Sequence, residues 1–109
     1  MSKVRVEHEG KVYELTYTKR TVSNLEAQGF DANKIDINPV TMIPLFYRAA
    51  FDAKHPMLSK STRDAVWYAQ RNKQGLLGAL VDIYTSVVMS LMDEPDGDDE
   101  GNATWEVLE

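Results

Sequence analysis

The sequence has 109 residues, of which 43% are hydrophobic and 27% are charged, and it contains no cysteine. This length suits one small domain and is too short for two separate cores. The lack of cysteine excludes a disulfide framework, a thiolate zinc site and cysteine catalysis.

Charge is divided unevenly along the chain. All 12 Lys and Arg residues lie at or before Lys73, where 8 acidic residues leave this part with a net charge of +4. Residues 74–109 carry 9 acidic residues and no basic one, which brings the whole chain to −5. A basic body followed by an acidic end is typical of a protein with an interaction tail.

The sequence shows no targeting or membrane segment. The N-terminus leads into alternating polar residues and lacks the apolar stretch of a signal peptide. The longest apolar stretch, residues 76–92, is interrupted by small and polar residues and falls short of the roughly 18 apolar residues that cross a bilayer. We therefore expect a soluble intracellular protein without a membrane partner.

Residues 3–17 alternate with period two around a central Glu-Gly pair, which predicts a β-hairpin. A register in which paired residue numbers sum to 19 places every apolar side chain on one face, whereas a sum of 18 mixes the faces. The loop length stays open between two and four residues, because Glu-Gly suits a type I′ turn poorly and both loops keep this register. The apolar face then consists of Val4, Val6, Tyr13 and Leu15.

A short helix over about residues 19–28 has clear signals at both ends. Thr18 is the expected N-cap, and Gly29 stops the helix. With Gly29 in the position after the C-cap, Leu25 and Phe30 are the pair that touch in a Schellman ending.

Three further helices follow in the second half of the body. Thr41 is the expected N-cap of the first, with Pro44 in its first turn, and His55-Pro56 marks its end. Either Ser59 or Ser61 caps the next helix. The expected ranges are about 41–54, 62–72 and 75–92.

The last helix, residues 75–92, is apolar over most of its circumference. Its polar positions form one narrow stripe at helical spacing. Such a helix has to be covered on most sides. Two interpretations stay open: a central core helix, or a core helix that leaves an apolar strip for a partner.

Residues 93–109 form the acidic tail of the predicted 1–92 domain. The stretch DEPDGDDEG at 93–101 offers too little apolar surface to fold, so a flexible spacer is expected. An apolar cluster with Trp105, Val107 and Leu108 follows it. This cluster is either a tethered recognition peptide or a strand that pairs with the hairpin of this chain or another. The fold class is thus α+β and mainly helical, with a hairpin, about four helices and a tail.

The residues that could take part in catalysis or metal binding do not form a recognisable catalytic or metal motif. The sequence has no phosphate-binding loop, and neither His8 nor His55 has a partner for a catalytic triad placed by the sequence. The acidic residues of the tail do not match EF-hand spacing. We therefore expect no enzyme activity, no cofactor and no metal.

The turn between the last two helices raises the possibility of a DNA-binding helix-turn-helix. The helix after Gly75 has no basic residue, and the acidic tail would repel phosphate. These features argue against a nucleic-acid partner.

Several motifs resemble those of small siphophage proteins of the tail assembly chaperone family. They are YTKRTVSNLEAQGFDANKID, NPVTMIPLFYRAAF, the His-Pro break, NKQGLLGALVDIY, and the acidic end before TWEV. The resemblance covers most of the chain, from about residue 13 to residue 107. It implies a non-enzymatic role in virion morphogenesis in the host cytoplasm, with binding of the tape measure protein and recruitment of tail tube subunits. Self-association is possible, and a small phage DNA-binding regulator is the alternative.

A holdase for a helical client needs exposed apolar side chains that adapt to their partner. The helices offer several candidates, for each of which core packing is the competing interpretation. The tail offers apolar residues that have no core of their own. The predicted partner-binding residues are Trp105, Val107, Leu108, Met89, Met92, Trp67, Tyr68 and Phe46, with Met42, Tyr47, Val88 and Leu91 as further candidates.

Overall fold

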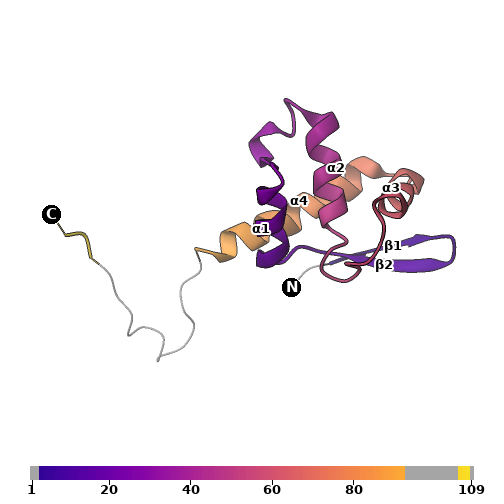
Figure 1. Ribbon diagram of the computed structural model, residues 1–109, viewed down its shortest axis with the longest axis horizontal. Helices are drawn as coiled ribbons and strands as arrows, with labels where there is room; N and C mark the ends of the chain where they lie inside the picture. Colours follow the sequence, from indigo (N-terminus) through magenta and orange to yellow (C-terminus); the bar gives the residue numbers. More distant parts are fainter. Residues whose placement is uncertain (1–2, 93–105, 109) are drawn as a thin grey trace.

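The computed structural model describes residues 3–92 and 106–108, and it has an N-terminal antiparallel hairpin followed by four helices (Figure 1). The predicted fold class, α+β and mainly helical, is therefore confirmed. The predicted acidic spacer at 93–101 and Trp105 lie outside the described residues. The elements are β1 (Val4–His8), β2 (Lys11–Leu15), α1 (Lys19–Ala27), the short 3₁₀ helix η1 (Ala32–Lys34), α2 (Pro39–Ala49), α3 (Lys60–Ala69) and α4 (Lys73–Ser90).

The hairpin has the predicted register. Its loop is the two-residue alternative, and both Glu9 (φ 51°) and Gly10 (φ 79°) adopt the positive φ of a type I′ turn. Glu9 accepts this conformation because the buried face fixes the pairing on either side of it. The apolar pairs are Val4 with Leu15 and Val6 with Tyr13, and all of these side chains except the half-buried Val4 are buried.

Both predicted ends of α1 are confirmed. The side chain of Thr18 accepts the backbone N–H of Thr21, and the hydroxyl of Thr21 accepts the backbone N–H of Thr18. These two bonds provide acceptors for backbone N–H groups that have no partner within the helix. At the other end Gly29 has a φ of 99°, and the N–H of Phe30 donates to the carbonyl of Leu25 at 3.4 Å in a Schellman ending.

Helix α2 begins earlier than predicted. Its N-cap is Asn38 and its first residue is Pro39, so the prediction of Thr41 as N-cap is wrong. The fixed φ of proline suits the first helical position, and the carbonyl of Asn38 accepts the N–H groups of Thr41 and Met42. As a result Pro44 lies inside the helix rather than in its first turn.

Helix α2 also ends earlier than predicted, at Ala49 instead of Lys54. A side chain from far along the chain contacts the backbone at this end. The backbone carbonyl of Arg48 accepts a hydrogen bond from Nη1 of Arg63 at 2.8 Å, and the chain beyond Ala49 continues in tight turns. The His-Pro pair that was expected to stop the helix lies in the loop that follows.

The guanidinium of Arg63 holds the loop between α2 and α3. Arg63 is only 8% exposed, although its side chain is charged. Each of its hydrogen bonds goes to α2 or to this loop. The acceptors are the carbonyls of Arg48 (2.8 Å), His55 (3.2 Å), Pro56 (3.2 Å) and Leu58 (3.0 Å) and the Oδ1 of Asp52 (2.5 Å).

The last two helices begin slightly earlier than predicted. Ser59 rather than Ser61 caps α3, and its side chain accepts the N–H of Thr62 at 3.2 Å. Asn72 caps α4 by accepting the N–H of Gly75 at 3.0 Å. Both helices also end two or three residues before their predicted ends, which is the usual uncertainty at helix termini.

Aromatic side chains form two stacked groups in the core. In the larger group the Phe46 ring stacks on Tyr17 (centroids 5.0 Å apart) and on Phe30 (5.2 Å), and Tyr84 of α4 meets Phe46 edge-on (5.5 Å). In the second, Tyr47 stacks on Trp67 at 4.5 Å. Within the described ranges, no helix is long and apolar enough to cross a membrane.

We predict that Arg63→Lys lowers the free energy of unfolding by about 2–4 kcal/mol, because lysine keeps the charge but cannot donate to five acceptors at once. Urea denaturation followed by circular dichroism measures the change. Arg71→Lys is the matched control, since Arg71 is exposed and should change stability by less than about 0.5 kcal/mol. Equal stability of the two variants would contradict a central role for Arg63.

A second prediction concerns the ion pair of Asp64 with Arg48, whose two N–H···O distances are 2.7 and 2.8 Å. The hydrogen bonds from Arg48 lower the pKa of Asp64, so the pair stabilises the fold above the carboxyl's ordinary pKa and loses this effect as the pH falls through the lowered value. Asp64→Asn should therefore reduce the free energy of unfolding by about 1–2 kcal/mol at neutral pH.

The difference between the wild type and Asp64→Asn should begin to shrink below about pH 4, where the unfolded carboxyl takes up a proton, and should be lost once the pH falls below the lowered pKa of the folded carboxyl. Urea denaturation at a series of pH values from 7 to about 2.5 tests this dependence. Asp82→Asn, on the exposed side of α4, is the control and should show no such trend. A difference that stays constant over the whole pH range would rule out the proposed effect of the pair.

Candidate functional site

The C-terminal end of α4 extends beyond α1, on the side of the body away from the hairpin turn (Figure 1). Three apolar side chains are exposed here: Met89 is 59% exposed, Leu91 67% and Met92 78%. The half-buried Val88 connects them to the core. We name residues 88–92 the α4 end. Clusters of exposed apolar side chains are typical of protein interaction sites.

The described part of the chain covers one side of α4. Leu80, Ile83, Tyr84 and Val87 are buried, and the predicted polar stripe lies towards solvent. The partly buried side chains between these two sides all pack against the core at their edges, and they are Leu76, Leu77, Val81 and Val88. Among the described residues, α4 is thus a core helix with exposed apolar side chains at its C-terminal end.

A groove beside the α4 end separates it from the first turn of α1. Its volume is about 530 Å³, and its apolar floor comes from Ile83 and Val87. Lys19 and Arg20, at the N-terminus of α1, form the opposite wall. Ser90, the last residue of α4, lies at its rim. The site therefore combines an apolar floor with two exposed cations.

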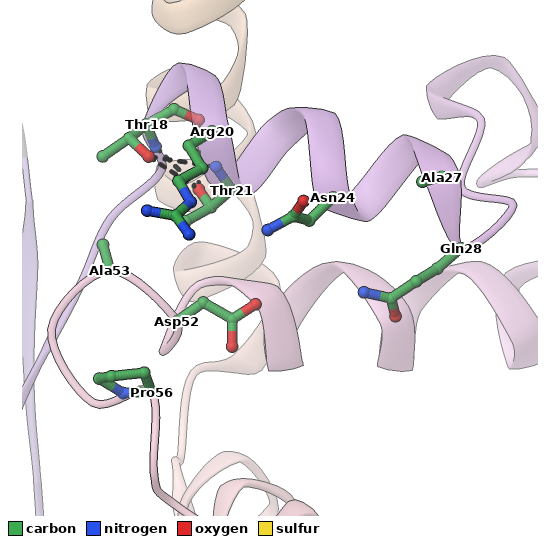
Figure 2. Close-up of a pocket in the computed structure, with 9 residues that line it drawn as sticks. All are labelled: Thr18, Arg20, Thr21, Asn24, Ala27, Gln28, Asp52, Ala53 and Pro56. Atoms are coloured by element: carbon green, nitrogen blue, oxygen red, sulfur yellow. Dashed lines mark hydrogen bonds between the residues drawn. The ribbon is translucent and has the colours of Figure 1, made fainter.

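The groove continues along α1 into a wider hollow of about 840 Å³. Figure 2 shows Arg20, Asn24 and Gln28 of α1 lining it, with Asp52 on the facing turn. A third hollow of about 340 Å³ shares Gln28 and Asp52 with the second and reaches Lys60 of α3. Because neighbouring hollows share lining residues, we treat the three as one surface and name it the basic groove.

Two of the five cations that line the basic groove are already paired. Arg63 binds Asp52, and Arg48 binds Asp64, whose hydrogen bond raises the pKa of the Arg48 guanidinium. The other three cations are Lys19, Arg20 and Lys60, and they make no ion pair with any residue in 3–92 or 106–108. The groove is therefore positively charged even after its internal pairs are counted.

Two of the predicted partner-binding residues belong to the core instead. Phe46 is 1% exposed and lies between the rings of Tyr17 and Phe30, and Trp67 is 7% exposed and stacks on Tyr47. The prediction that these two contact a partner is wrong, because their apolar helical positions face the core. Met42 and Tyr47 among the further candidates are likewise buried.

The remaining predicted residues are exposed but do not all lie together. Met89 and Met92 form the α4 end with Leu91. Tyr68 is 66% exposed on α3, at the opposite end of the body (Figure 1). Val107 and Leu108 are 72% and 85% exposed. Trp105 lies outside the described residues, so its predicted role stays a prediction.

The basic groove is not evident from the sequence. Its one local signal was the Lys19-Arg20 pair directly after the N-cap Thr18, a place where helices more often carry acidic residues. The facing wall comes from residues more than thirty positions away and could not be read from a local pattern.

In residues 3–92 and 106–108 no three His, Cys, Asp or Glu side chains are placed to hold a metal ion. His55 has a structural contact, since its Nε2 accepts the backbone N–H of Glu14 at 3.1 Å. His8 lies 3.8 Å from the carboxylate of the neighbouring Glu9 at the exposed hairpin turn.

Comparison with known proteins places the chain in a family. No curated protein and no solved structure matches it. One family model, described as a domain of unknown function (DUF5055), matches residues 1–108. Because this match covers nearly the whole chain, the protein belongs to the DUF5055 family.

Proposed function

We propose that the protein is a non-enzymatic tail assembly chaperone of a siphophage, which binds the tape measure protein in the host cytoplasm and helps to recruit tail tube subunits. The observation that carries this proposal is the α4 end, where Met89, Leu91 and Met92 are exposed together on a projecting helix. The identity of the client comes from the motifs that resemble the chaperone family.

Methionine at two of the three exposed positions suits a chaperone. Its side chain is unbranched and polarisable, so it adapts to apolar surfaces of different shape. A long helical client presents such surfaces repeatedly along its length. The exposed part of the α4 end is therefore suited to hold many similar helical segments rather than one defined partner.

The surroundings of the α4 end support the same role. Lys19 and Arg20 lie beside it across the groove and can pair with acidic residues that flank an apolar stripe on a client helix. The exposed Val107 and Leu108 stay predicted as a second contact, tethered to α4 through the acidic segment. The net charge of −5 helps to keep a complex with an apolar client soluble.

The proposal is tested by co-expression with the tape measure protein encoded by the same phage. We predict that the triple variant Met89→Ser/Leu91→Ser/Met92→Ser weakens capture of this protein at least about tenfold, since truncated apolar anchors in an interface cost on the order of 1–2 kcal/mol each. Pull-down yield and titration with a purified tape measure fragment measure the loss.

The matched control removes equally exposed apolar side chains elsewhere on the body. Ile37→Ser/Val40→Ser/Met57→Ser changes residues that are 73%, 87% and 94% exposed, and it should bind as the wild type does. Equal loss in both triple variants would indicate non-specific stickiness and contradict a site at the α4 end. Salt-dependent retention on DNA, without capture of the tape measure protein, would favour the DNA-binding alternative.

A further inference from the structure

The basic groove has more positive charge than the described residues neutralise. Lys19, Arg20 and Lys60 line it without an ion-pair partner in residues 3–92 or 106–108. The sequence carries the matching charge directly after α4, because residues 93–101 contain six acidic side chains and no basic one. The chain thus contains both a cationic groove and an anionic segment.

The position of the groove favours this segment over other anions. Ser90 at the end of α4 lines the groove, so the acidic segment begins at one of the groove's ends. From there the groove follows α1, a helix of nine residues whose length is about 14 Å. Nine extended residues reach about 30 Å, which is ample to follow it.

We propose that the basic groove is the docking surface for the chain's own acidic segment, residues 93–101. In the docked state the acidic side chains lie against Lys19 and Arg20 at the near end of the groove and approach Lys60 at the far end.

Tethering makes such a contact possible with weak individual ion pairs. A short linker between two sites gives a local concentration on the order of millimolar, so an affinity too weak to detect between separate molecules still populates the docked state. Exposed ion pairs are screened by salt, and docking should therefore weaken as the ionic strength rises.

The docking contact itself requires no partner, so it is tested on the chain alone and stands or falls independently of the proposed chaperone role.

Paramagnetic relaxation in nuclear magnetic resonance spectra tests the proposal on the full chain. The natural sequence has no cysteine, so Asn102→Cys gives one site for a nitroxide spin label just beyond the acidic segment. The expected result at low salt is loss of amide signal at the far end of the groove, at Lys60 and Leu45. These residues are chosen because α4 itself lies near the label whether the segment docks or not.

Charge reversal supplies the decisive variant. Lys19→Glu/Arg20→Glu should restore at least half of the lost signal at Lys60 and Leu45. Both residues are exposed, and acidic residues in the first turn of a helix are favourable, so the fold is retained. The control Lys11→Glu/Lys34→Glu makes the same change of charge at exposed positions outside the groove and should leave the signal loss as it is.

Three results would overturn the proposal. The first is signal loss confined to the α4 end, which means that the segment does not enter the groove. The second is equal recovery of the amide signal in both double variants, or signal loss that persists at about 0.5 M salt. Either outcome excludes specific charge pairing. The third is signal loss of full size in a mixture of isotope-labelled and separately spin-labelled chains, which means that the segment binds a second copy.

Discussion

The buried guanidinium of Arg63 determines how the two halves of this fold meet. By binding carbonyls from Arg48 to Leu58 it joins the last turn of α2 to the loop that follows. That loop in turn binds the hairpin through two backbone N–H groups on the same edge of β2. The Nε2 of His55 accepts the N–H of Glu14, and the carbonyl of Ala50 accepts the N–H of Thr16, the residue after Leu15. One side chain of α3 thus connects the helices to the hairpin.

In this arrangement α4 is buried on one side and exposed at its last turn. Tyr17, Phe30 and Phe46 contact its Tyr84 and help to bury one side of it. No described element covers its last turn, which keeps Met89 and Met92 exposed. The same packing places the N-terminus of α1 beside that turn and so creates the basic groove. The packing of the core therefore places the proposed client site next to the proposed docking site for the acidic segment.

Local signals made much of the fold predictable, whereas distant contacts did not. The hairpin register followed from its alternation, and Thr18 and Gly29 marked the ends of α1, because each signal acts within a few residues. At the end of α2 the Arg48 carbonyl binds Arg63, and no local pattern predicts that contact. Among the candidate partner-binding residues, Met89 and Met92 are exposed whereas Phe46 and Trp67 are buried, since periodicity alone does not tell a core face from a binding face.

The central claim is that the α4 end, and not another exposed apolar position, contacts the client. Site-specific photo-crosslinking in phage-producing cells tests it most directly, with a benzophenone side chain placed at Met89 or at Tyr68, which is exposed on α3 at the other end of the body. The account predicts crosslinks to the tape measure protein from position 89 and none from position 68. Crosslinks from position 68 alone, or no crosslink to that protein from either position, would contradict it.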